Sequence, residues 1–223
     1  MLRQFGKICQ KYFKEFLLLI FPLNCAGCGK WDVSVCKQCY KAISTQPFLS
    51  NRFSDYNIWV ANNYNIPIKP IILQWKDHAR KDLNKIIIKR IMHAFTTANW
   101  QKISPNLILV PIPSTKKAIR QRGFCQTKTL AHAIANNWQN ITVRNLLIKK
   151  GGMAAHKLTK KQTRHAEFYL NKSNYQINQL ANSTPVVLID DVVTTGNTII
   201  KCQQILEQNN YKVIGTAVIA EAN

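Results

Sequence analysis

Uninterrupted apolar runs alternate with stretches of helical periodicity in the second half of the chain. Leu107–Val110 and Val186–Ile189 are continuous apolar runs, which are typical of strands buried on both faces of a sheet. Apolar positions recur at helical spacing from Phe124 to about Trp138 and from Thr198 to about Glu207. Tyr211–Ala220 predicts a final strand. This order predicts an α/β fold with a mainly parallel sheet flanked by helices.

The pattern is less regular before residue 105. Residues 57–65, NIWVANNYN, fit either a strand or a turn-rich connection. Helical spacing predicts helices from Ile68 to about Trp75 and from Asp82 to about Asn99. The polar residues 76–81 between them form either a solvated loop or a segment that turns Lys76 toward a phosphate.

Four of the seven cysteines form two pairs with metal-ligand spacing. Cys25 and Cys28 are separated by two residues, as are Cys36 and Cys39. This spacing lets four thiolates surround one tetrahedral Zn²⁺, and a closed four-thiolate shell predicts a structural site. Two disulfides are the alternative, which a reducing compartment disfavours. The segment either serves only as a staple or also presents nearby basic and aromatic residues to nucleic acid: Lys30, Trp31, Lys37 and Tyr40.

The segment 186–198, VVLIDDVVTTGNT, predicts a strand, a turn and the start of a helix. Free amides at a helix N-terminus favour a phosphate, and Gly196 allows a close backbone approach. Asp190 and Asp191 would repel that phosphate, so we expect them to serve sugar hydroxyls, Mg²⁺ or a positive charge on a sugar ring. These features predict a ribose 5-phosphate site. A chance pair of aspartates before a threonine-rich helix cap is the alternative, whereas P-loop and Rossmann fingerprints are absent from the sequence.

The charge of the chain is concentrated away from this site. The formal net charge is +21, and residues 107–183 hold thirteen Lys and Arg residues against one acid. A basic excess of this kind favours a polyanion, with nucleic acid ahead of a small pyrophosphate compound, although a lysine-rich solvated surface is the alternative. After the first strand, a basic loop that contains Lys116 and Arg122 would grip an anion. Residues 149–164 form a second basic stretch, either disordered or a mobile lid.

The sequence closely resembles a known family at these positions. VVLIDDVVTTGNT resembles the phosphoribosyl pyrophosphate (PRPP) motif of type I phosphoribosyltransferases. Together with VPIP (110–113), RGFCQ (122–126) and the cysteine pairs, it resembles the ComF group from about Phe21 to the end. Two departures are visible, because Cys125 replaces an Asn of the group's RGFNQ and residues 155–158 lack its usual Gln.

The resemblance implies roles for individual positions. Asp190 and Asp191 would bind the ribose hydroxyls and act as the catalytic pair in an active enzyme that uses Mg²⁺ with PRPP. The remaining PRPP-binding residues would be Val192, Val193, Thr194, Thr195, Gly196, Asn197 and Thr198. The residues that face the pyrophosphate would be Lys116, Arg122 and Gly123. The candidate DNA-binding residues are Lys149, Lys150, Lys157, Lys160, Lys161 and Arg164.

Three functions are compatible with these features. The first is a ComF-type competence protein that handles incoming single-stranded DNA in natural transformation and binds PRPP. The second is an active phosphoribosyltransferase, and the third is a zinc-containing adaptor that recruits a DNA-uptake or helicase partner through Phe13–Phe21. We expect a cytoplasmic protein without a membrane span, because no apolar run reaches about 18 residues. The expected units are a zinc-binding segment (1–45), a helical connecting or hood region (46–104) and a type I phosphoribosyltransferase-like domain (105–223).

Overall fold

The computed structural model describes residues 23–31, 33–53, 55–150, 167–171 and 184–222. The helices in these ranges are α2 (Lys37–Ile43), α3 (Ile68–Asp77), α4 (Asn84–Thr97), α5 (Trp100–Ile103), α6 (Lys116–Arg122), α7 (Gln126–Ala135) and α9 (Asn197–Glu207), with the 3-10 turns η1 (Asn51–Phe53) and η2 (Lys81–Leu83). The strands are β1 (Phe48–Leu49), β2 (Ile58–Asn63), β3 (Leu107–Pro111), β4 (Ile141–Val143), β5 (Leu147–Lys150), β6 (Glu167–Leu170), β7 (Val186–Ile189), β8 (Val192–Val193) and β9 (Val213–Glu221).

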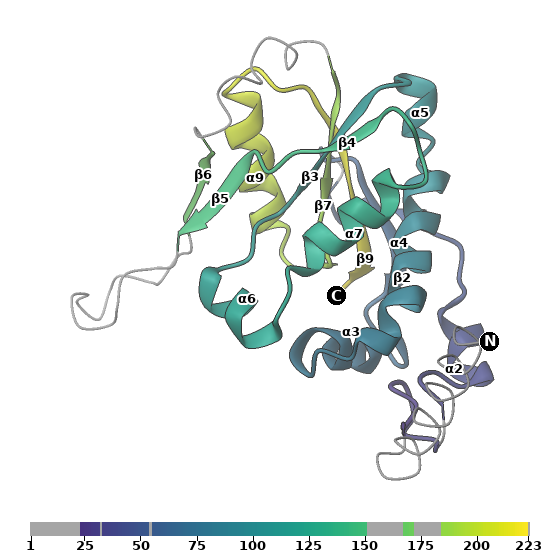
Figure 1. The fold of residues 1–223 in the computed structure, drawn as a ribbon. Coiled ribbons are helices and arrows are strands. Elements are labelled where there is room, and N and C mark those ends of the chain that lie inside the picture. The colour runs from purple at the N-terminus through teal and green to yellow at the C-terminus, as the bar shows by residue number, and fades with distance from the viewer. Residues whose placement is uncertain (1–22, 32, 54, 151–166, 172–183, 223) are drawn as a thin grey trace, which may run out of the picture.

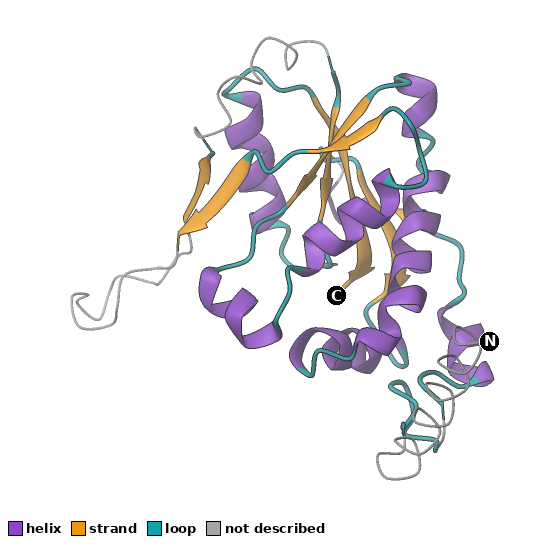
Figure 2. Ribbon diagram, in the orientation of Figure 1, coloured by secondary structure: helices purple, strands orange, loops and turns teal. Residues whose placement is uncertain are grey.

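A mainly parallel sheet lies at the centre of the molecule, between helices on both sides (Figures 1 and 2). Within the described ranges it has seven strands in the order β1-β2-β9-β7-β3-β4, with β8 also paired to β9. Every pairing in it is parallel except that of β1 with β2. The predicted α/β fold is therefore confirmed.

Alternate residues of the central strands enter two separate cores. Leu107 and Leu109 of β3 belong to the core beneath α3, α4 and α7. Ile108 and Val110 point to the opposite core, which is shared with α9. Because both faces of the strand are covered, alternation of polar and apolar residues disappears and a continuous apolar run results.

The segment 57–65 is a strand and not a turn-rich connection. β2 pairs in parallel with β9 along its length, with Ile58 opposite Thr216. Its buried Asn62 donates a side-chain hydrogen bond to Ile43 O (2.8 Å) and accepts one from Arg90 Nε (2.9 Å). Strands from the predicted connecting region thus lie in the same sheet as the strands that follow residue 105.

Two expectations around the basic stretches need correction. The predicted basic loop after β3 is the short helix α6, whose N-cap Thr115 accepts a hydrogen bond from Ala118 N (3.2 Å). The predicted long loop at 149–164 begins later, because Lys149 and Lys150 belong to β5, which pairs with β6 as an antiparallel hairpin. The rest of that stretch and the N-terminal Phe13–Phe21 lie outside the described residues.

Candidate functional site

The segment between β7 and α9 begins with a strand and ends in a helix as the sequence predicts, but its Val192 and Val193 form the short strand β8, which pairs with β9. Gly196 is the N-cap of α9 with φ 74°, and no side chain caps the helix start. The loop encloses a small pocket of about 50 Å³. The residues that line it are Asp190, Val192, Val193, Thr194, Thr195, Gly196, Thr198 and Ile199. The free first-turn amides and the helix dipole both favour an anion in this pocket.

Two carboxylates follow the carboxyl end of β7. Asp190 accepts a hydrogen bond from Asp191 N (2.9 Å), and Asp191 accepts one from Val192 N (2.7 Å). Burial, together with the charge of Asp191, raises the pKa of Asp190 to about 8. Both causes favour the protonated form of Asp190, which can donate as well as accept a hydrogen bond.

Asp191 has a cationic partner from a distant segment. Lys76 Nζ, from the last turn of α3, lies 2.8 Å from Asp191 Oδ2. Lys76 lies within the helix, so the predicted polar break is shorter than expected. The ion pair supports the alternative in which Lys76 faces the ligand site. The ion pair also fixes the orientation of the Asp191 carboxylate beside Asp190.

Two residues of η1 contact the loop that precedes α9. The Phe53 ring packs against Gly196, where an added methyl group would lie 2.5 Å from Cε1 of that ring. Arg52 Nη2 donates to Thr194 O (3.2 Å), and Arg52 also donates to Ala222 O. Sequence reasoning missed these two residues, since η1 has no spacing or motif that would link it to a loop more than 140 positions away.

Helix α6 lies near the same edge of the sheet as α3 (Figure 1). Lys116 is exposed at its start, and Gly123 ends it with φ 74°. Arg122 Nη2 donates to Asp77 Oδ1 (3.2 Å), so α6 is joined to the residue that follows Lys76. The role of Lys116, Arg122 and Gly123 in facing a pyrophosphate stays a prediction.

The described candidate DNA-binding residues lie on the β5–β6 hairpin. Lys149 Nζ lies 4.9 Å from the centre of the Phe168 ring, and Lys150 Nζ lies 4.8 Å from that of Tyr169. These lysine–aromatic pairs combine a positive charge with a ring on which a base could stack. The other four candidates lie outside the described residues: Lys157, Lys160, Lys161 and Arg164.

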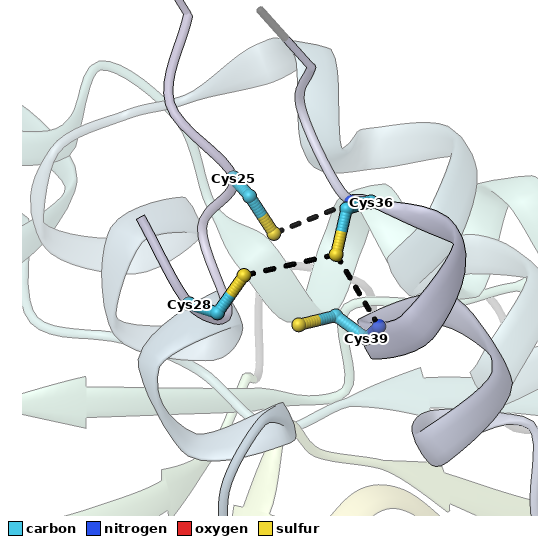
Figure 3. Close-up of side chains that lie close together, drawn as sticks. All are labelled: Cys25, Cys28, Cys36 and Cys39. Carbon is cyan, nitrogen blue, oxygen red and sulfur yellow. Dashed lines mark hydrogen bonds between the residues drawn. The ribbon is translucent and has the colours of Figure 1, made fainter. Parts of the chain in front are cut away.

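The four paired cysteines converge on one point (Figure 3). Their sulfur atoms all lie within 4.8 Å of one another, and Cys28 Sγ lies 3.7 Å from Cys36 Sγ. Tetrahedral Zn²⁺ with Zn–S bonds of about 2.3 Å requires sulfur atoms about 3.8 Å apart, so the cluster fits the ion. A four-sulfur shell would leave no position for substrate, which favours a structural role.

Backbone amides favour the thiolate at two of the four cysteines, whereas burial and the neighbouring cysteines raise the pKa of Cys39. Burial raises the pKa of Cys25, but hydrogen bonds from backbone amides, chiefly that of Cys36 (3.3 Å), outweigh it and lower the pKa to about 6. The Cys39 amide, which donates to Cys36 Sγ (3.5 Å), lowers the pKa of Cys36. Ligand thiols must lose their protons to bind zinc, so these amides favour the ligand form of Cys25 and Cys36.

Comparison with known proteins shows a similarity to phosphoribosyltransferases over part of the chain. Residues 138–223 match the family model of the phosphoribosyl transferase domain. Among solved structures, adenine phosphoribosyltransferase from Rhodothermus marinus is 16% identical with a TM-score of 0.40, covering 83% of this chain and 88% of that one. The enzyme from Saccharomyces cerevisiae is also 16% identical with a TM-score of 0.40, covering 83% and 90%. The family match places a phosphoribosyltransferase-type domain in residues 138–223, in agreement with the predicted fold.

Two curated relatives are similar to this chain over more than half of its length. A protein of Escherichia coli O6:H1 named "DNA utilization protein YhgH" is 22% identical over 204 residues, or 85% of each chain. Its counterpart in strain K12 is 24% identical over 161 residues, covering 68% of this chain and 66% of the relative. With the four-cysteine cluster and the phosphoribosyltransferase-type domain, these matches confirm the resemblance to the ComF group. Within the described residues, no helix is both long and apolar enough to span a membrane.

Proposed function

We propose that this protein handles incoming single-stranded DNA in the cytoplasm during natural transformation and binds PRPP at the loop 190–198. One observation carries the proposal: Asp190 lines the pocket at the uncapped start of α9, and its neighbour Asp191 is held by Lys76. An anion-binding helix start next to sugar-binding carboxylates has the chemistry of a phosphorylated ribose.

The bound ligand would use each part of the site differently. The first amides of α9 and the hydroxyls of Thr194, Thr195 and Thr198 would hold the 5-phosphate, while Asp190 and Asp191 would accept hydrogen bonds from the ribose hydroxyls. Lys116, Arg122 and Gly123 would face the pyrophosphate. Mg²⁺ would supply charge neutralisation on that pyrophosphate.

The basic surface supports the DNA part of the proposal. Helix α6 carries four basic residues and no acid, and none of its residues is buried. The hairpin adds Lys149 and Lys150 with their aromatic partners. Sequence-independent contacts of this kind bind a single strand through its phosphates and stacked bases. The YhgH relatives are named DNA utilization proteins, which agrees with this role.

Titration of the purified protein with PRPP and a single-stranded oligonucleotide, separately and together, tests the proposal. We expect salt-dependent oligonucleotide binding, and PRPP binding that Asp191→Ala weakens at least tenfold. Competition between the ligands would show that they share the basic surface. Lack of salt-dependent oligonucleotide binding would refute the DNA role, and lack of PRPP binding would refute the assignment of the loop.

An active phosphoribosyltransferase is the second candidate, favoured by the adjacent carboxylates of Asp190 and Asp191. A nucleophile would form a bond to C1 of the ribose while the bond from C1 to the pyrophosphate breaks, and pyrophosphate would leave with the bonding electrons. The positive charge that develops on the ring would be stabilised electrostatically by Asp191. Release of pyrophosphate from Mg²⁺-PRPP that disappears in Asp191→Ala would support this activity, whereas release that persists would exclude this site as its source.

A DNA-uptake or helicase partner is a further expectation, which concerns the N-terminal stretch Phe13–Phe21. It is tested by affinity capture with the full chain and with a chain that lacks this stretch. A partner that is lost with the stretch would support the adaptor role, and equal capture by both chains would refute it.

A further inference from the structure

The four-cysteine segment contacts the beginning of α3. Gly27, between the first two cysteines, packs against Pro67, the residue that precedes the helix. A methyl group added at Gly27 would lie 2.8 Å from Pro67 Cβ and 2.8 Å from Cys39 Sγ. The turn that carries the cysteines, the second cysteine pair and the start of α3 are therefore in direct contact.

The same segment also contacts the chain just beyond the end of α3. Arg80 Nη1 donates to Asn24 O (2.7 Å), next to the first metal-ligand cysteine. Arg80 is held in place by Asp82, at 2.6 Å from Nη2 to Oδ2, and Asp82 is in turn hydrogen-bonded to Ser34. The four-cysteine segment thus contacts the chain on both sides of α3, at Pro67 before the helix and at Arg80 beyond it.

Helix α3 is packed as a rigid unit between these contacts. Four of its side chains are fully buried, each at most 1% exposed: Ile68, Ile71, Ile72 and Trp75. Trp75 Nε1 donates to Asn84 Oδ1 (2.7 Å), and the ring packs edge-on against Phe124 with centroids 5.6 Å apart. A close-packed helix transmits a displacement instead of absorbing it.

The last turn of α3 reaches the ligand site. Lys76 Nζ lies 2.8 Å from Asp191 Oδ2, and the two side chains are only 20% and 14% exposed. A charge-assisted hydrogen bond in such a shielded place depends steeply on its geometry. A small shift of α3 would therefore change how Asp191 is held.

We infer that the metal-binding segment acts as a brace for the ribose site. It fixes the chain on both sides of α3, and α3 places Lys76 on Asp191. The inference rests on the proposed binding of PRPP at this loop. Lys76 is a positioning residue, since it orients the carboxylate that would receive the ribose hydroxyls. Loss of the metal lowers the affinity for PRPP, although the cysteine cluster and the ligand loop belong to different parts of the chain.

The first measurement needs no ligand. Hydrogen–deuterium exchange of the full chain, with metal bound and after chelation, follows the peptides that cover α3. We expect faster exchange in residues 68–77 after metal removal, while peptides from β3 and β7 stay protected. Unchanged exchange in α3 would overturn the inference, whether or not the protein binds PRPP.

The second measurement connects the metal to Lys76. Calorimetric titration gives the PRPP affinity of wild type and Lys76→Ala, each with and without metal. We expect chelation to weaken binding about tenfold in wild type, the loss that corresponds to one charge-assisted hydrogen bond, and less than twofold in Lys76→Ala. Lys76→Arg should restore part of the metal dependence. An equal effect of chelation in wild type and Lys76→Ala would overturn the role of Lys76.

A variant that spares the metal ligands covers the case in which chelation unfolds the protein. Arg80→Ala removes the contact with Asn24 O and leaves all four cysteines in place. We expect it to keep its metal, to exchange faster in α3 and to bind PRPP several-fold more weakly, while the matched control Lys85→Ala, an exposed position on α4, behaves like wild type. Wild-type exchange and affinity in Arg80→Ala would contradict the brace. If wild type with its metal does not bind PRPP at all, the proposed function fails and the exchange experiment alone decides this inference.

Discussion

The Phe53 ring lies directly against Gly196, so the turn that begins α9 has no room for a side chain. Gly196 has φ 74°, a conformation that costs other residues free energy. Two separate effects therefore disfavour a larger residue at position 196: the contact with the Phe53 ring and the positive φ of the backbone. They can therefore be separated by experiment.

The first prediction concerns this contact. Gly196→Ala should lower the free energy of unfolding by about 2 kcal/mol, from backbone strain and overpacking combined. Chemical denaturation of wild type, Gly196→Ala, Phe53→Leu and the double variant measures it. Phe53→Leu should recover part of the loss, because it removes the clash but not the strain. A double variant that is less stable than the sum of the single effects predicts would contradict this division.

The second prediction concerns pH. The pKa of Asp190 is raised from the ordinary value of about 3.9 to about 8 in the folded protein, so between these values the folded state binds more protons than the unfolded state. The stability contributed by this proton is present at low pH and is lost as pH rises through that window. Asp190→Asn should therefore gain thermal stability over wild type as pH rises from 5 to 9.

Thermal unfolding at several pH values measures this gain. Asp191→Asn is the matched control, since it removes the ion pair with Lys76 and should destabilise the protein. A difference between Asp190→Asn and wild type that does not grow with pH would refute the assignment of the raised pKa.

The third prediction concerns a buried cation. Arg90 is 5% exposed, and its guanidinium donates to Asn62 Oδ1 (2.9 Å), Thr45 O (2.7 Å) and Ala61 O (2.6 Å). Arg90→Leu would leave these buried acceptors without their donor and should cost about 2–4 kcal/mol in urea unfolding. Arg90→Lys should recover little, because one ammonium cannot reproduce the planar fork. Full recovery by lysine would show that charge alone suffices.

The fourth prediction concerns the metal. Elemental analysis of the purified chain should find one zinc per molecule. Cys36→Ser should lose it and unfold at a lower temperature. Cys125→Ser is the matched control and should keep the metal, because Cys125 lies beside Thr127 at the start of α7 and outside the cluster. Zinc retained at full stoichiometry in Cys36→Ser would contradict the four-thiolate site.

The fifth prediction concerns DNA. Replacing three exposed residues of α6 by Ala (Lys116, Lys117 and Arg120) should reduce the salt dependence of oligonucleotide binding, with the slope of log K against log salt concentration smaller by about 2. A triple variant at exposed lysines of other helices (Lys41, Lys85 and Lys102) is the control and should keep the wild-type slope. Equal slopes for both variants would place the DNA elsewhere.

The parts of the fold that could be predicted from sequence are those with local signals. β3 and β7 were visible because burial on both faces leaves continuous apolar runs. The cysteine spacing predicted the four-cysteine cluster, and the VVLIDDVVTTGNT segment predicted the strand and the helix start on either side of residues 190–196. In each case the residues that make the feature are neighbours in the chain.

The parts that could not be predicted depend on distant partners. β2 contains buried Asn62, whose polarity is tolerated only because Arg90 and Ile43 O satisfy it. α6 has no buried residue and so no apolar periodicity, and only its capping Thr115 and terminal Gly123 indicate a helix. The charge of Lys76 indicated an anionic partner, but no sequence pattern indicated that this partner is Asp191.

The pairing of β2 with β9 has a consequence for synthesis of the protein. Ile58 lies opposite Thr216, so one of the longest pairings in the sheet joins segments made early and late. While the chain grows on the ribosome, β2 emerges long before its partner exists, and its unpaired edge is open to wrong pairing. The sheet can therefore be completed only after residues 213–221 have been made, and a pause in translation before residue 213 should prolong the time for which this edge of β2 is unpaired.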